Sequence, residues 1–287
     1  MATRPISAPY PEHPLYKENH LKPAIIKREV PARGRRVLVL PDLHLRPANG
    51  GVQSGEDTES LAAVLRYVQN HKWDEVVQIG DLMDFDCISS HNVNKLRLVE
   101  GQRIQKDYDY ANDFLDTWQK ATKGATWTVI EGNHDERIER YIDANPALEG
   151  SIEVAKSLHF KERGIRWVRF WTKGEIYSIG NAHFIHGEHT SKYHAEKTAS
   201  EYGVCVFFGH THDCMCIPKS LKGADKSIVG QSLGCLCRYN QPYMRGRPSK
   251  WQQAFGVFHF QPNGFFNHYV VTIFDHKFIS PEGEYCK

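Results

Sequence analysis

Short apolar runs that end abruptly in acidic or histidine residues recur along this sequence. Residues 76–79 read Val-Val-Gln-Ile, and Gly80 and Asp81 follow at once. A run of this kind predicts a buried strand whose carboxyl end delivers a side chain to a crevice, where open α/β sheets bind ligands. A single carboxylate after a strand is common, because Asp favours turns. Four further predicted strands end in the same residue types: Asp42-Leu43-His44, Asn133-His134-Asp135, His186-Gly187 and His210-Thr211-His212.

The order of the predicted elements indicates the fold class. Residues 37–40 form a continuous apolar run, Asp57 or Thr58 can cap a helix with apolar residues at helical spacing, and residues 73–79 form the next strand. This is a βαβ pattern, whereas from residue 165 onward the pattern is mainly β. Two mixed sheets packed face to face, with helices outside, satisfy both halves. We therefore predict an α/β fold, a four-layer sandwich of two mixed β-sheets flanked by helices.

Turn signals divide the rest of the chain. Strands are expected at residues 126–130, 167–171, 175–179, 183–186, 204–208, 227–233, 254–260 and 265–274. Turns at Lys173-Gly174, Gly180-Asn181 and Asn263-Gly264 separate several of them. Helices are expected at residues 136–141, 151–158 and 191–202, with Pro146 and Gly203 as stop signals.

A single domain is expected over residues 37–287, preceded by a proline-rich extension. Residues 1–36 contain six prolines without a clear period, which predicts an extended arm that could be a tether or a lid. Residues 86–123 interrupt the βαβ pattern as an insertion. Its second half predicts a long amphipathic helix, and its first half carries His91, Lys95, Arg97 and Arg103. The insertion is either a solvated segment packed on the sheet or a wall that faces a substrate.

Charge and targeting signals exclude several classes of protein. The formal net charge of +2 is nearly balanced, so no overall field argues for nucleic acid. Seven cysteines are an odd number, the first ten residues lack an apolar signal core, and no apolar run approaches the roughly twenty residues that span a membrane. These features predict a soluble cytoplasmic protein without a membrane partner.

Two Cys-x-Cys pairs leave a choice open. Cys214 and Cys216, like Cys235 and Cys237, fall on predicted strands, where alternate residues share a face. Four sulfurs could therefore converge on a zinc ion. This spacing is unusual for structural zinc, and buried free thiols are common.

The order of the strand-end motifs carries the functional prediction. They read Asp-x-His, Gly-Asp-x-x-Asp, Gly-Asn-His-Asp, His-Gly and Gly-His-x-His, each after a predicted strand. With this set, residues from about 37 to 212 resemble the calcineurin-like metallophosphoesterases. The resemblance implies two metal ions bridged by Asp81. Asp42, His44 and His212 would hold one ion, and Asn133, His186 and His210 would hold the other.

The resemblance also implies roles around the reaction. His134 would lie beside the phosphoryl oxygens and the leaving group, oriented by Asp135, and Asp84 would support the metal site without being a ligand. Carboxylate and imidazole ligands suit manganese, iron or zinc better than calcium, and manganese is favoured. Two such ions would clamp a phosphate and activate water for attack on phosphorus. A metal-binding scaffold that has lost catalysis is the alternative.

Substrate choice is less constrained. Arg137 follows the central histidine and is a candidate phosphate clamp, whereas Arg140 is expected to face solvent. Residues 238–250, including Arg238 and Arg245, interleave arginine with tyrosine and could hold phosphates and stack bases, or form a solvated basic loop. We expect a phosphodiesterase that acts on nucleotides or nucleic acid. A phosphomonoesterase of a nucleotide or small metabolite and a non-catalytic nucleic-acid-binding module are the alternatives.

Overall fold

Two six-stranded sheets form the centre of the protein, as seen in a computed structural model that describes residues 23–50, 52–223, 226–241, 244 and 246–287. The first sheet has the order β1 (Ile25–Arg28), β6 (Ile176–Ile179), β7 (Ala182–Ile185), β8 (Cys205–Phe208), β10 (Ser227–Ser232) and β9 (Cys216–Ser220). The second has the order β12 (Phe266–Thr272), β11 (Ala254–Phe260), β2 (Arg35–Leu40), β3 (Glu75–Gln78), β4 (Thr126–Ile130) and β5 (Ile165–Val168). A small hairpin pairs β13 (Phe278–Ile279) with β14 (Tyr285–Cys286).

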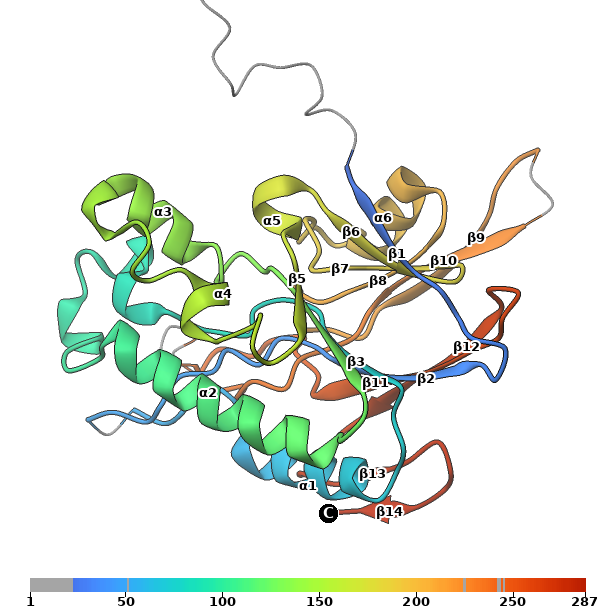
Figure 1. Cartoon of the computed structure of the whole chain (residues 1–287), viewed down its shortest axis with the longest axis horizontal. Coiled ribbons are helices and arrows are strands. Elements are labelled where there is room, and N and C mark those ends of the chain that lie inside the picture. The colour runs from blue at the N-terminus through green and yellow to red at the C-terminus, as the bar shows by residue number, and fades with distance from the viewer. Residues whose placement is uncertain (1–22, 51, 224–225, 242–243, 245) are drawn as a thin grey trace, which may run out of the picture.

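Helices cover the outer faces of both sheets, which gives the four predicted layers. Helices α1 (Thr58–Gln69) and α2 (Ile104–Ala121) pack on the second sheet, and α6 (His194–Tyr202) contacts β8, β9 and β10 of the first. Figure 1 shows these layers in order, from α1 and α2 at the bottom to α6 at the top. The predicted α/β sandwich of two mixed sheets is confirmed.

Strand β2 shows how the sequence produces two cores. Val37 and Val39 join the core between the sheets, where they meet aromatic side chains such as Phe258. Leu38 and Leu40 point the other way, into the core beneath α1 and α2. Because successive residues of a strand face opposite sides, a continuous apolar run supplies both cores at once.

The described part of the N-terminal extension belongs to the sheets. Strand β1 pairs in parallel with β6, with Ile25 opposite Ile176. Arg28 and Arg35 both form ion pairs with the buried carboxylate of Glu75, at 3.4 and 2.9 Å. Residues 23–36 thus lie against the sheets, and residues 1–22 lie outside the described residues.

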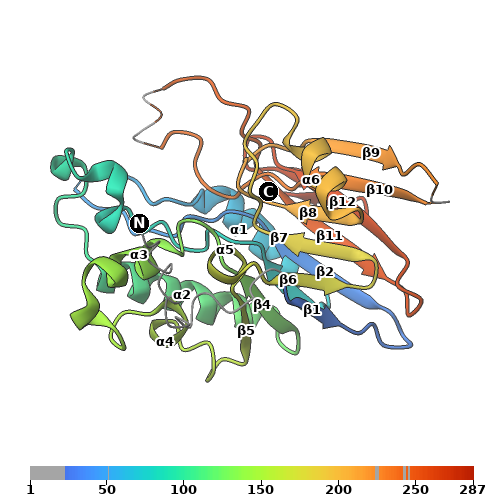
Figure 2. The same ribbon diagram turned by 90° about the horizontal axis from the view of Figure 1, so that it is seen from above.

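The insertion has the predicted long helix. The face of α2 that carries Tyr108, Ala111, Leu115 and Trp118 is buried, as its spacing predicts. Before α2, three 3₁₀ turns occupy Asp86–Ile88, Ser90–Asn92 and Leu96–Leu98. The first of these turns contacts α3 (Arg137–Ala144), and Figure 2 shows the segment beside that helix. The insertion therefore borders the helix that follows the Gly-Asn-His-Asp motif.

One predicted strand pair is wrong. Residues 167–171 and 175–179 were expected as strands joined by a turn at Lys173-Gly174, but the short helix α5 (Phe170–Lys173) stands between β5 and β6, which belong to different sheets. The remaining predicted strands and helices occur close to their expected positions, including α4 (Val154–Ser157) and a 3₁₀ turn at Pro146–Leu148. Among the described residues, the helices are too short or too polar to cross a membrane.

Candidate metal centre

Five strand ends bring their polar side chains to one place. In the second sheet, β2, β3 and β4 run parallel, and Asp42, Asp81 and Asn133 follow them. In the first sheet, β7 and β8 run parallel, and His186 and His210 follow them. Because the carboxyl ends of these strands meet at one edge of the sandwich, residues far apart in the sequence become neighbours.

The first group of candidate ligands is fully buried. Potential ligand atoms of Asp42, His44, Asp81 and His212 lie within 4.8 Å of one another. The Nε2 atoms of His44 and His212 are 3.1 Å apart, and His212 Nε2 is 3.1 Å from Asp42 Oδ1. Nε2 of His44 is 3.6 Å from Oδ2 of Asp81. Two imidazoles and two carboxylates thus converge on one point.

The second group shares Asp81 with the first. Ligand atoms of Asp81, His186 and His210 also lie within 4.8 Å of one another. Nε2 of His186 is 3.4 Å from Asp81 Oδ2 and 3.0 Å from Oδ1 of Asn133. The structure therefore brings together all seven residues that the sequence analysis assigns to two metal ions, with Asp81 between the two groups.

The chemistry of these side chains fits cations. Oδ2 of Asp42 is buried without a hydrogen-bond partner in the described part of the chain. Nδ1 of His186 donates to the carbonyl of Ile79 at 3.0 Å, which aims Nε2 at Asp81 and Asn133, both of which offer acceptor oxygens. Burial lowers the pKa of His186, but the Asp81 and Asp42 carboxylates and the hydrogen bond to Ile79 together raise that pKa to about 9. The surroundings of His186 Nε2 therefore favour a positive charge, whether that of a proton or of a metal ion.

Backbone conformation supports a functional role for the same residues. His44, Asp81, His210 and His212 have φ angles of 51°, 52°, 67° and 59°, in the left-handed region that favours glycine. They are half of the eight non-glycine residues with positive φ in the described part of the chain. Such strain costs on the order of 1 kcal/mol or more per residue and clusters at functional sites.

Two motif glycines allow the carboxylates to approach the backbone. A Cβ atom on Gly132 would lie 2.2 Å from Oδ1 of Asp81, and one on Gly209 would lie 2.1 Å from Oδ2 of Asp42. Any larger residue at either position would displace a candidate ligand. The glycines of the Gly-Asn-His-Asp and Gly-His-x-His motifs are thus explained by close contact.

His134 is oriented by Asp84, not by Asp135 as the resemblance implied. Nδ1 of His134 lies 3.0 Å from Oδ1 of Asp84. Burial opposes ionisation of Asp84, but hydrogen bonds from His134 and His44 outweigh it and hold the pKa of Asp84 well below its ordinary value. Asp135 instead accepts hydrogen bonds from the backbone N–H groups of Leu82, Met83 and Gly132. Its carboxylate therefore ties the Gly-Asn-His-Asp loop to the loop after β3.

Arg46 and Asp86 complete the surroundings of His134, and the sequence analysis missed both. Nη1 of the buried Arg46 lies 2.9 Å from Asp86 and 3.5 Å from Asp84. Arg137 contacts Asp86 at 3.3 Å, the carbonyl of Asp84 at 2.7 Å and Nε2 of His134 at 3.1 Å. A signal for Arg46 was present, since it stands two residues after the Asp-x-His motif, but its nearest carboxylate partner, Asp86, lies in the insertion.

A cavity of about 420 Å³ opens beside this network. Asn133, His134 and Arg137 line one side, and residues of the insertion, including Lys95, line the other. Residues of the insertion therefore line a cavity next to the candidate metal centre.

Arg238, another predicted substrate residue, lies elsewhere. Arg238 donates from Nη2 to Oγ1 of Thr58 at 3.2 Å and does not line this cavity. Arg140 is largely exposed and forms an ion pair with Glu136, as expected of a residue that faces solvent. Arg245 lies outside the described residues.

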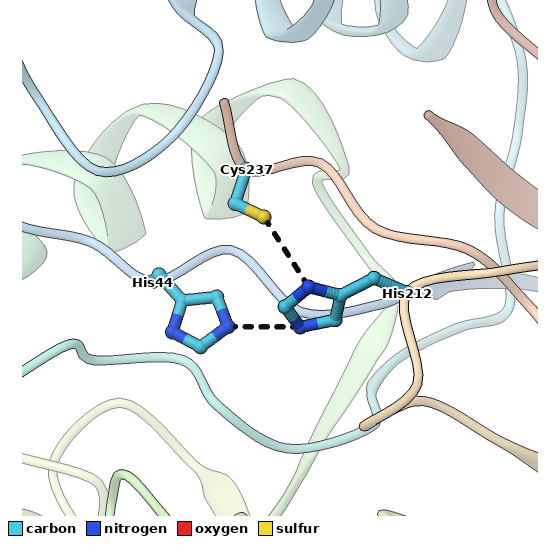
Figure 3. A group of neighbouring side chains, drawn as sticks. All are labelled: His44, His212 and Cys237. Carbon is cyan, nitrogen blue, oxygen red and sulfur yellow. Dashed lines mark hydrogen bonds between the residues drawn. The ribbon is translucent and has the colours of Figure 1, made fainter. Parts of the chain in front are cut away.

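Cys237 lies beside the candidate ligands, and its sulfur and potential ligand atoms of His44 and His212 lie within 4.8 Å of one another. Figure 3 shows that the two nitrogens of His212 point in different directions: Nε2 toward His44, and Nδ1 toward the sulfur of Cys237, 3.9 Å away. The thiol therefore contacts the outer edge of a candidate ligand.

The four-sulfur zinc site is not formed by the described residues, where no potential metal group contains two cysteines. Cys235 and Cys237 are buried, whereas Cys216 is exposed. The expectation that both pairs lie on strands is also wrong, because only Cys216 is within one, β9.

Two tryptophans flank the histidines. The ring of Trp171 lies 5.9 Å from that of His186 and 5.5 Å from that of His210, and Trp251 lies 4.2 Å from His212, centroid to centroid. These aromatic rings limit the positions that the imidazoles can take.

Two mixed sheets with a shared carboxylate between two ligand groups define an α/β sandwich with a candidate binuclear metal centre. A sequence profile described as calcineurin-like phosphoesterase matches residues 35–214, more than half of the chain, and the chain belongs to this family. The family comprises metal-dependent hydrolases of phosphoric esters, which agrees with the site.

Two phage proteins are similar to this chain. The Gene 54 protein of Mycobacterium phage L5 is 29% identical over 213 residues, which cover 70% of this chain and 83% of that protein. The Gene 54 protein of Mycobacterium phage D29 is 26% identical over 212 residues, with the same coverage. Their names carry no information about substrates.

Proposed function

We propose that this metal-dependent phosphoesterase is a phosphodiesterase that acts on nucleotides or nucleic acid with two divalent metal ions, of which manganese is favoured. The observation that carries the proposal is the position of Asp81, which belongs to both ligand groups and lies directly beside His134, whose backbone N–H donates to Asp81 Oδ1 at 2.8 Å. Paired ligand groups of this kind suit in-line displacement at phosphorus.

The ligand assignment follows from the two groups. Asp42, His44 and His212 would hold one ion, and Asn133, His186 and His210 the other, with Asp81 bridging them. When bound, the two ions supply Lewis-acid activation of the phosphoryl group and of the attacking water. Burial opposes ionisation of Asp81, but His186 and His134 outweigh it and hold its pKa well below the ordinary value, so Asp81 is available as an anion.

His134 and Arg137 act on the substrate in this proposal. With Nδ1 held by Asp84, His134 directs Nε2 toward Arg137 and the cavity. Protonated at Nε2, His134 would give its proton to the leaving oxygen. Arg137 would exchange its contact with His134 for one with a phosphate oxygen, since a guanidinium group matches phosphate geometry.

The cavity beside His134 has the size to hold an organic group of the ester. A diester carries an organic group on each side of its phosphate, and a cavity of about 420 Å³ next to His134 has room for one of them. The alternative is a phosphomonoesterase of a nucleotide or small metabolite, which needs a binding site for one organic group only.

A comparison of two chromogenic esters tests the proposal. The protein loaded with manganese, iron or zinc is assayed with bis-p-nitrophenyl phosphate and with p-nitrophenyl phosphate. We expect a higher kcat/KM for the diester. A higher value for the monoester would favour the phosphomonoesterase. Binding of oligonucleotides without turnover of either ester would favour the non-catalytic nucleic-acid-binding module.

A further inference from the structure

We infer that the cavity beside the metal centre binds a second phosphate group of the substrate, so that the substrate is a dinucleotide with an additional phosphate or a longer strand. This inference rests on the proposed phosphodiesterase activity and specifies its substrate class. It assigns a binding role to Lys95 and His91 of the insertion.

The cavity connects the reacting groups with the insertion. It is lined by the half-buried Asn133 and His134, at the candidate metal centre, and by the exposed His91 and Lys95. A ligand that fills it therefore touches both sides at once. A volume of about 420 Å³ is in the range of pockets for whole small molecules and exceeds the needs of a single phosphate.

The permanent charges around the cavity are unbalanced. Arg46, Arg137 and Lys95 line it together with one carboxylate, Asp86. Asp86 pairs with both arginines, at 2.9 Å for Arg46 and 3.3 Å for Arg137, and Asp84 lies 3.5 and 3.7 Å from the same two guanidinium groups. Asp84 and Asp86 thus compensate the charges of the two guanidinium groups, and Lys95 is left without a counter-charge among the described residues. The uncompensated charge of Lys95 therefore makes its part of the cavity attractive to an anion.

The side chains of Lys95 and His91 have no partner among the residues that the structure describes. No ion pair to either side chain, and no hydrogen bond from either, is formed there, although both border the cavity. Arg97 is exposed in the same segment but does not line the cavity. A lysine and an imidazole that face a cavity without carboxylates of their own are suited to phosphate oxygens.

A second phosphate accounts for this arrangement better than a base or sugar does. With the scissile phosphate beside His134 and Arg137, the next phosphate of a strand would lie in the direction of Lys95 and His91. A nucleotide with one phosphate would leave Lys95 unpaired. The size of the cavity and its excess of cations therefore point to a substrate with two neighbouring phosphates.

Two thymidylate substrates test this inference. Thymidylyl-thymidine has one phosphodiester, and trithymidylate has two, so that a second phosphate flanks whichever bond is cleaved. For the manganese-loaded protein we expect kcat/KM per bond to be about tenfold higher for trithymidylate, as one lost phosphate contact would produce. In Lys95→Ala the preference should nearly disappear, whereas Arg97→Ala, a matched control from the same segment, should keep it.

A binding measurement gives a second readout. A phosphorothioate trithymidylate is titrated into each manganese-loaded protein at several salt concentrations. Loss of one contact to a single strand should reduce the slope of log K against log salt by about 0.7 in Lys95→Ala and leave it unchanged in Arg97→Ala. The inference would be overturned if the wild type, Lys95→Ala and Arg97→Ala had equal slopes and cleaved both substrates equally per bond. The proposed phosphodiesterase activity would not be affected by that result. Failure to cleave bis-p-nitrophenyl phosphate and both thymidylates would instead overturn the proposed function.

Discussion

Nδ1 of His134 lies 3.0 Å from Oδ1 of Asp84, and this contact fixes the imidazole at the inner side of the cavity. Asp135, the next residue in the sequence, directs its carboxylate to three backbone N–H groups instead. The two carboxylates therefore have separable roles, one in orienting His134 and one in holding two loops together.

Replacement of Asp84 by asparagine should lower turnover without removing the metals. We expect kcat to fall by about a hundredfold, because a positioned acid or base contributes roughly 10²–10⁴ to such reactions. The loss should be larger for an alkyl ester than for a p-nitrophenyl ester, since a poor leaving group depends more on proton donation. Metal content per chain should be unchanged. Equal losses for both esters would argue against a role for Asp84 through His134.

Replacement of Asp135 by alanine should mainly reduce stability. Three buried N–H groups would lose their acceptor, and the expected loss in the free energy of unfolding is on the order of 3 kcal/mol. Urea denaturation measures it. Asp143→Ala, in the exposed part of the neighbouring helix α3, is the control and should change stability by less than about 0.5 kcal/mol. A loss in Asp135→Ala no larger than that of the control would contradict this role.

Asp107 should make stability depend on pH. Burial, and after it the charge of Asp84, raises the pKa of Asp107 from 3.8 to about 7. The folded state therefore keeps a proton that the unfolded chain releases above about pH 4. The stability that this proton provides is fully present below pH 4 and is lost as pH rises toward 7.

The variant Asp107→Asn removes this dependence. Relative to the wild type, its free energy of unfolding should increase between pH 4 and pH 7, by on the order of 1–3 kcal/mol in total. Urea denaturation over this range measures the difference. A difference that stays constant with pH would show that Asp107 ionises normally in the folded protein.

Removal of the Cys237 thiol should weaken metal binding without changing the number of ions. The sulfur contacts Nδ1 of His212 at 3.9 Å, and groups that hold the outer nitrogen of a metal ligand typically contribute about 10–100-fold to affinity. We expect Cys237→Ala to lower manganese affinity by about tenfold, as measured by titration. Cys235→Ala is the control, because the hydrogen bond of the Cys235 thiol goes to the carbonyl of Cys237, at 4.0 Å, and not to a ring nitrogen of a candidate ligand. Equal affinities in the two variants would contradict a role for the thiol.

The candidate ligands could be predicted because each stands directly after a strand that its own residues specify. Val76 and Val77, for example, belong to an apolar run that predicts a buried strand, and the structure has that strand with Asp81 shortly after its end. Parallel pairing then brings such ends together. The fold class follows from the same local patterns.

Features that depend on contacts between distant segments could not be predicted. Helix α5 forms where a strand and turn were expected, because Glu131 accepts hydrogen bonds from the backbone N–H and hydroxyl of Thr172, and Glu175 accepts from the N–H of Arg169. The hydrogen bond from Arg46 to Asp86 likewise joins the loop after β2 to the insertion. Periodicity and turn signals contain no information about such partners.

The most direct test of the account is the metal content of the wild type and of Asp81→Ala. Each protein is loaded separately with manganese, iron and zinc, freed of unbound metal and analysed by mass spectrometry, with circular dichroism to verify the fold. We predict about two ions per wild-type chain for at least one metal, and fewer than about one per chain in Asp81→Ala. At most one ion per folded wild-type chain with all three metals, or two ions per chain in Asp81→Ala, would contradict a binuclear centre bridged by Asp81.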